Sequence, residues 1–222
     1  MERKALRTEL RRDYLDDATP PYLYEDDALN GFLNDAQRQV CLRKRALIDS
    51  TSTVTQFELP IGAQRVRLNP AILAVRFARL NDCHPLTGTT AKRLLKRDPD
   101  WDMSDPGSPR YWVPDYQEGF LYFDRPTDIA RTLKLSVWRM PLEAEQMEDD
   151  GDSPIIAEHY HQDLLDWAAY RAFSMKDSEL GDEKRAATHL QTFEAKVGRL
   201  PNMTEVRLWG IQPVVGVPAE FI

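Results

Sequence analysis

The strongest candidate for metal or catalytic chemistry is the pair His159 and His161, which lies close to Asp163 and Asp166. Imidazole and carboxylate groups serve as metal ligands and as general bases. Residues two apart do not share a helical face, so the two histidines are poorly placed to chelate one ion. His159 and Asp163 do share a face, a spacing more typical of a surface pair. We predict no metal and no cofactor, and keep a metal-dependent enzyme as the weaker alternative.

Motifs for other chemistries are missing from the sequence. No HExxH, GxSxG or SxxK motif is present, and neither GxxxxGK[ST] nor GxGxxG supports nucleotide binding. The stretch 143–152 holds six Asp or Glu residues and no Lys or Arg. It lacks the alternating ligands and central glycine of a calcium loop, so we predict a solvated acidic loop. The chain is therefore predicted not to be an enzyme.

The charge balance bears on nucleic-acid binding. Lys and Arg number 29 against 36 Asp and Glu, a formal charge of -7, which disfavours gripping phosphates over most of the surface. Two basic groups near the N-terminus are candidates for intersubunit or DNA-facing charges: Arg7, Arg11, Arg43, Lys44 and Arg45. Residues 1–48 nevertheless hold nine basic and nine acidic residues. We favour a solvated or intersubunit ion-pair surface, with a nucleic-acid-binding regulator as an alternative that requires a basic face.

The cysteines and the N-terminus indicate where the chain is made. Cys41 and Cys83 have no CxxC or ligand spacing and are interpreted as reduced thiols of a cytosolic protein. Met1 to Lys4 is charged and no apolar region follows, so no signal peptide is expected. No apolar run approaches the roughly 18–20 residues of a membrane span. We expect synthesis in the cytoplasm and no membrane partner.

Apolar spacing predicts four long helices. Residues 4–17 carry a narrow stripe that ends at Thr19-Pro20-Pro21, and residues 25–48 keep the helical period throughout. Gly31 interrupts the second helix, and we expect close packing to explain it. Ser153 and Pro154 suit the start of a third helix, and a fourth is expected over residues 178–197.

Alternating patterns between the helices predict short strands. The clearest covers residues 72–80, others cover 111–116, 119–123 and 132–138, and two further strand starts fall near 54–59 and 66–68. Residues 90–96 are expected to form a short helix capped by Thr90. The pattern indicates a small antiparallel sheet or barrel.

Residues 199–222 differ from the rest of the chain. They are poor in charge and broken by proline and glycine, yet rich in large apolar side chains. A terminal segment this apolar should bury itself on its own domain or on another chain, unlike a disordered tail. The side chains expected to make this contact are Trp209, Ile211, Val214, Val215, Val217 and Phe221.

These elements predict an α+β fold that is mainly α. We expect a four-helix bundle (1–48 and 153–198) with an inserted small antiparallel β-region (49–142), an acidic loop (143–152) and an extended C-terminal arm (199–222).

Two helical patterns resemble the head-to-tail adaptor, or connector, proteins of tailed bacteriophages. The first lies in "YLYEDDALNGFLNDAQRQV", with Tyr24, Asp26, Asp27, Leu29 and Asn34 at the matching positions. The second is "IIAEHYHQDLLDWAAYRA", followed by an acidic turn and a helix holding His189 and Phe193. Both are patterns of helical positions and not catalytic motifs.

The resemblance implies a structural virion protein without enzymatic activity. It implies a homo-oligomeric ring, commonly of twelve subunits, beneath the portal protein at the head-tail junction. Such a ring extends the channel for packaged double-stranded DNA and offers a docking surface for tail or neck proteins. A tail-tube or head-completion neck component is the structural alternative.

Overall fold

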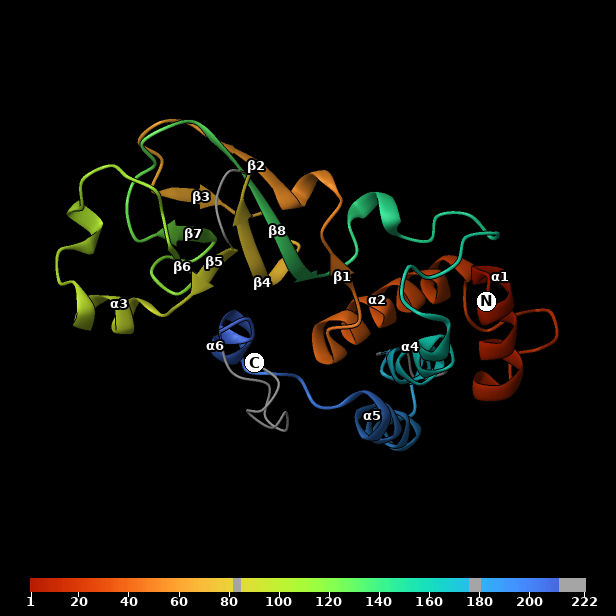
Figure 1. Cartoon of the computed structure of the whole chain (residues 1–222). Helices are drawn as coiled ribbons and strands as arrows, with labels where there is room; N and C mark the ends of the chain where they lie inside the picture. The colour runs from red at the N-terminus through yellow and green to blue at the C-terminus, as the bar shows by residue number, and fades with distance from the viewer. Residues whose placement is uncertain (82–84, 176–180, 212–222) are drawn as a thin grey trace. The chain divides into compact units, whose positions relative to one another are not determined.

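Four helical segments share one apolar core (Figure 1). They are α1 (Arg3–Glu9), continued by the π-helical turn η1 (Leu10–Leu15), α2 (Asp26–Lys44), α4 (Asp163–Phe173) and α5 (Glu183–Val197). Leu6 and Leu10 of the first segment and Leu33 and Val40 of α2 are completely buried, as their helical spacing predicts. A short connection, Glu143–Glu145 (η4), precedes the chain's return to α4.

The predicted start of the third helix is wrong. Ser153 and Pro154 precede an irregular stretch and a short 3-10 turn, η5 (Glu158–Tyr160), and α4 begins only at Asp163. The Ile155 N–H donates a hydrogen bond of 2.7 Å to the Gln37 side chain on α2. This stretch is therefore held against α2 and does not begin a helix.

The strands form one curled sheet of eight members (Figure 1). Its order is β1-β8-β4-β5-β6-β7-β3, with β2 paired to β8. The bounds are β1 (Ile48–Asp49), β2 (Gln56–Leu59), β3 (Arg65–Arg67), β4 (Ile72–Leu80), β5 (Pro85–Gly88), β6 (Tyr111–Val113), β7 (Phe120–Phe123) and β8 (Arg131–Arg139). The turns η2 (Thr53–Thr55) and η3 (Trp101–Met103) and two helices, α3 (Ala91–Arg97) and α6 (Met203–Leu208), accompany it. The β5–β6 pair is parallel, so the sheet is mixed.

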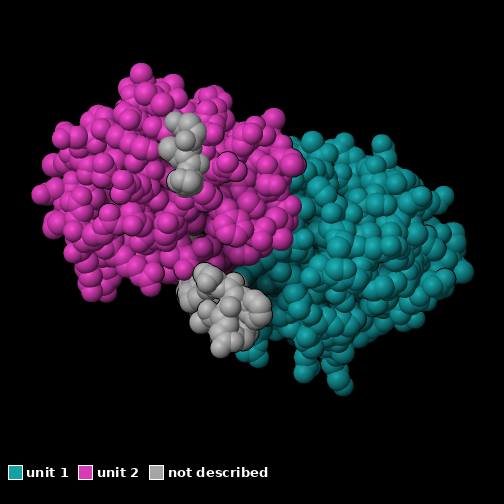
Figure 2. Space-filling model, viewed as in Figure 1, with its two compact units in different colours: residues 1–47, 139–201 teal, residues 48–138, 202–222 magenta. Residues whose placement is uncertain are grey.

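The chain divides into two compact units, coloured separately in Figure 2. We call residues 1–47 with 139–201 the helical unit, and residues 48–138 with 202–222 the sheet unit. This computed structural model describes residues 1–81, 85–175 and 181–211. The sheet unit has its own core, which includes Leu80, Leu121, Phe123 and Leu133.

The predicted fold class is therefore wrong. The chain is not a four-helix bundle with a small antiparallel insertion, because the eight-stranded mixed sheet forms a unit with its own core. Strands β1 and β5 have two and four residues, too few to show a period, and their partners lie far along the sequence. Pro85, where a strand break could be expected, is the first residue of β5.

Burial along β4 also departs from simple alternation. Val75, Ala78 and Leu80 belong to one core, so the buried phase slips by one residue at Arg76 and Phe77. The Arg76 guanidinium lies 5.4 Å from the Phe77 ring centroid, and Phe77 is left exposed. The bounds of β4 agree with the prediction, but a period of two along the whole strand does not.

Candidate functional site

The two histidines of the predicted chemical site have different surroundings. The His161 side chain is buried, and its Nδ1 lies 2.9 Å from the Met1 amino nitrogen while Nε2 lies 3.1 Å from the Ile156 carbonyl oxygen. Burial lowers the pKa of His161. His159 is exposed and contacts the Tyr160 ring. Within the described parts of the chain, no group of three or more His, Cys, Asp or Glu side chains could hold a metal ion.

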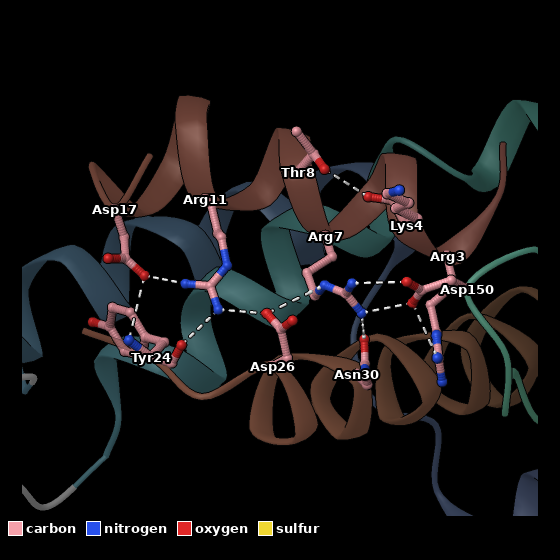
Figure 3. A network of polar contacts seen from close by, with 10 residues as sticks. All are labelled: Arg3, Lys4, Arg7, Thr8, Arg11, Asp17, Tyr24, Asp26, Asn30 and Asp150. Carbon is pink, nitrogen blue, oxygen red and sulfur yellow. Dashed lines mark hydrogen bonds and ion pairs between the residues drawn. The ribbon is translucent and has the colours of Figure 1, made fainter. Parts of the chain in front are cut away.

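Arg11, one of the predicted surface charges, is buried at the centre of a polar network (Figure 3). Its guanidinium donates to the Asp17 carboxylate, to the Tyr24 carbonyl at 2.6 Å and to Asp26 Oδ1 at 2.7 Å. Arg11 and Asp17 have side chains only 7% and 2% exposed. A buried ion pair depends on such additional hydrogen bonds, so this arginine holds the connection between η1 and α2.

Arg7 joins the same network to the acidic loop (Figure 3). It donates to Asn30 Oδ1 and Asp150 Oδ1, both at 2.9 Å, and pairs with Asp26 at 3.3 Å. Arg3 also bonds Asp150, and these two arginines hold the pKa of that carboxyl below its usual value. The loop is acidic, as predicted, but Asp150 is bound to α1.

Asn34 fixes the same loop from α2. Its Oδ1 accepts from the Met147 N–H at 3.0 Å, and its amide donates to the Met147 carbonyl at 3.2 Å. Met147 is consequently buried inside the acidic stretch. Tyr24, Asp26 and Asn34, which carry part of the resemblance to adaptors, therefore have structural contacts within the helical unit.

The residues of the second predicted basic group, at the end of α2, differ in burial. Arg43 is 5% exposed and donates to the Gly198 carbonyl at 2.9 Å, with Glu194 at 3.3 Å. Its guanidinium lies over the Trp167 ring, 5.1 Å from the centroid. Lys44 and Arg45 are less buried, and partial burial lowers the pKa of Arg45. The structure does not gather the five predicted charges into one surface.

An acid–base cluster not recognised in the sequence joins α4 to α5. Asp166 is 3% exposed, accepts from Lys196 Nζ at 2.7 Å and lies 3.4 Å from His189 Nδ1. Burial raises the pKa of Asp166, but the bonds to His189 and Lys196 outweigh it, so the net pKa is lowered. The cluster lies on two helices of one core and is explained by structural pairing.

The C-terminal segment begins on its own sheet unit. Val206 and Trp209 pack against Ala74 of β4, and the Trp209 and Trp138 rings meet edge to face at 6.1 Å. Ile211 packs against the main sheet core. Val214, Val215, Val217 and Phe221, the other predicted contact residues, lie outside the described residues.

A dense exposed basic surface lies on α3, which the sequence pattern predicted only as a short helix. Four of its seven residues are cations: Lys92, Arg93, Lys96 and Arg97. All four are exposed, and no ion pair joins any of them to a carboxylate within the described parts of the chain. The Arg97 guanidinium lies 4.5 Å from the Tyr111 ring centroid. The sequence signal for this basic surface is "AKRLLKR", which lies in a stretch, 85–97, that contains no Asp or Glu.

Most of the sequence matches one known protein family. Among the described helices, none is long and apolar enough to cross a membrane. No curated protein matches the chain. A family description does match: the SU10 adaptor protein family covers residues 1–216. The predicted resemblance to phage adaptors is confirmed, and the chain belongs to the SU10 adaptor protein family, whose members are bacteriophage structural proteins of the adaptor type.

Proposed function

We propose that this adaptor forms a homo-oligomeric ring beneath the portal of a tailed phage. The proposed ring has twelve subunits, as is common among such proteins. The match to an adaptor family over residues 1–216 is the observation that carries the proposal. The ring would extend the DNA channel and offer the tail or the next neck protein a docking surface. Its role is structural and not enzymatic.

The charge distribution supports a channel through which DNA slides. The helical unit holds 16 Lys or Arg and 23 Asp or Glu residues, whereas the sheet unit holds 13 of each. The whole excess of seven negative charges therefore belongs to the helical unit. An acidic surface repels phosphate and disfavours tight, static binding of the packaged duplex.

The C-terminal residues 212–222 are the proposed contact with the portal or an adjacent subunit. Ordering a residue costs about 1–2 kcal/mol, and burying a large apolar side chain returns about 1.5–3 kcal/mol. The free energy gained by burying four apolar side chains therefore does not exceed the free-energy cost of ordering the whole segment. These side chains are Val214, Val215, Val217 and Phe221. A single contact of this kind would be weak, and a ring would hold its partner by many contacts at once.

A phage that lacks the chain tests the role. We expect heads that package DNA but carry no tails, and restored infectivity when the chain is supplied in trans. Tailed particles of normal composition without the chain would contradict the adaptor role. Heads that join tails but lose DNA would instead favour the head-completion alternative.

Truncation after Ile211 tests the proposed contact. The described contacts of the sheet unit involve residues up to Ile211, so the truncation removes none of them. We expect a folded chain that no longer enters particles. The matched control, Met203→Ala, changes an exposed side chain on α6 and should enter normally. Normal incorporation of the truncated chain would exclude this segment as the contact.

A further inference from the structure

An apolar loop projects from the helical unit between η1 and α2. Tyr22 and Leu23 are 50% and 60% exposed, although both are large apolar side chains. Asp17 accepts the Leu23 N–H at 2.7 Å, and the Arg11 guanidinium lies 4.2 Å from the Tyr22 ring centroid. The buried Arg11–Asp17 pair thus fixes the loop that presents these side chains, which we call the Tyr22–Leu23 loop.

Acidic residues are frequent in and beside this loop in the sequence. Residues 13–27 contain six Asp or Glu and no Lys or Arg. Four of these acids are paired with arginines of the same unit: Asp13 with Arg12, Asp16 with Arg185, and both Asp17 and Asp26 with Arg11 (Figure 3). The other two, Glu25 and Asp27, are exposed and follow Leu23 closely in the chain. The loop therefore combines an apolar centre with negative charge.

The α3 surface has the opposite character on the sheet unit. Leu95 is 44% exposed and shares the short helix with the four exposed cations. Thr90 caps the helix by accepting the Arg93 N–H at 3.2 Å, so these side chains project from an ordered turn. Residues 85–97 contain no acid, and Asp98 and Asp100 follow only after the helix has ended. Asp115 lies at the start of the helix, where its carboxylate accepts the Ala91 N–H at 2.8 Å.

We propose that the Tyr22–Leu23 loop of one copy docks on the α3 surface of a second copy. An apolar centre with a charged rim is the usual anatomy of a protein interface, and the opposite charges of the two surfaces select this pairing. A contact between two different patches of one chain is heterologous, and its repetition builds a ring when the rotation between copies closes. The inference rests on the proposed ring function and names the surfaces that build the ring.

Duplex DNA is the other anion that α3 could bind. Phosphate contacts need cations but no exposed leucine beside them, and they leave the apolar Tyr22–Leu23 loop unexplained. The second copy accounts for both surfaces with one contact. DNA binding is therefore kept as an outcome of the test.

Engineered cysteines test the contact directly. Leu23→Cys and Leu95→Cys are placed in separate copies of the full chain, both carrying Cys83→Ser, and the copies are mixed with and without the portal protein of the same phage. Oxidation should yield mixed dimers. Ile61→Cys, which is also at a highly exposed position, replaces Leu95→Cys in the control and should yield none. Dimers formed by Leu23→Cys copies alone, or rings without mixed dimers, would overturn the proposal.

Charge exchange provides the second test. Lys92→Glu with Lys96→Glu should weaken ring formation about tenfold, and Glu25→Lys with Asp27→Lys in the same chain should restore it. Arg67→Glu with Lys134→Glu reverses two exposed cations elsewhere on the sheet unit and should leave assembly unchanged. A different result would overturn the proposal: the Lys92→Glu, Lys96→Glu variant no longer binds duplex DNA, and the added Glu25→Lys and Asp27→Lys changes do not restore ring formation. That result would show that α3 binds DNA.

Failure of the docking contact and failure of the adaptor role can be told apart. Rings on the portal that persist when α3 carries the two reversed charges would refute the docking contact and leave the adaptor role intact. Disulfide formation between the Leu23→Cys and Leu95→Cys copies, without any ring on the portal, would support the contact and refute the role.

Discussion

At the scale of single residues, the charges that suggested an outer surface mostly hold the fold together. Arg7, Arg11 and Arg43 are used in buried or half-buried contacts within the helical unit. Sequence alone showed their types and the helical faces near them. It could not show that Asp17, Asp150 and Glu194 lie opposite, because these partners depend on how separate segments pack.

Removing Arg11 should expose how strongly the buried pair is needed. Arg11→Met leaves the Asp17 carboxylate buried without its cation, and we expect a loss of about 3–5 kcal/mol in the free energy of unfolding. Urea denaturation followed by circular dichroism measures it. Arg12→Met removes an exposed guanidinium, so the urea midpoint should stay close to that of the wild type. Equal transition midpoints for the two variants would contradict the account.

Asp166 should make stability depend on pH. Its folded-state pKa is lowered, so its contribution is present above the unfolded value of about 3.9 and is lost as pH falls through the folded value. Asp166→Asn should cost about 1.5–3 kcal/mol near pH 7, and the difference should shrink below about pH 4. Burial raises the pKa of Asp163, so Asp163→Asn should cost little. A pH-independent deficit in Asp166→Asn would contradict this interpretation.

The buried Cys41 thiol should be inert. Burial raises its pKa to about 12, so almost no thiolate exists near neutral pH. In a Cys83→Ser variant, iodoacetamide should fail to label the native chain at mildly alkaline pH and should label one thiol after denaturation, as counted by mass spectrometry. Rapid labelling of the native variant would show that Cys41 is accessible.

At the scale of elements, segments with a strong apolar period were predicted correctly, and the pairing of the short strands was not. The helix α2, the capped helix α3 and the bounds of β4 follow from local patterns. The mixed sheet order does not, because β5 pairs in parallel with β6 across the α3 connection. Likewise, the sequence predicts that α3 is a helix. It does not predict that α3 is the exposed basic surface, because that depends on which of the other cations are buried.

Glycines show the same difference between pattern and packing. The expectation that close packing explains Gly31 is wrong, since nothing lies within 4 Å of a Cβ placed there. At Gly210, by contrast, a Cβ would lie 1.7 Å from the Val75 carbonyl oxygen. This position after α6 must therefore be glycine for the segment to approach β4 this closely.

Substituting these two glycines gives a matched prediction. Gly210→Ala forces the end of α6 away from β4 and should destabilise the sheet unit by about 1–3 kcal/mol. Gly31→Ala should be neutral or stabilise α2 by up to about 1 kcal/mol. Thermal unfolding of both variants measures the contrast. A Gly210→Ala chain as stable as wild type would refute the close approach.

At the scale of the whole molecule, the chain combines an acidic helical unit with a neutral sheet unit that carries a basic helix. This division of charge suits repeated contacts between copies, and the family assignment is that of a phage structural protein. The fold class could not be predicted because the sheet is assembled from strands of two to nine residues.

The most direct test of the central claim is the mass of the purified chain, measured by light scattering and negative-stain microscopy, alone and with the portal protein of the same phage. We predict a ring seated on the portal, with the chain alone remaining a monomer or a small oligomer. A chain whose mass is unchanged by the portal, and which never decorates it, would contradict the adaptor account.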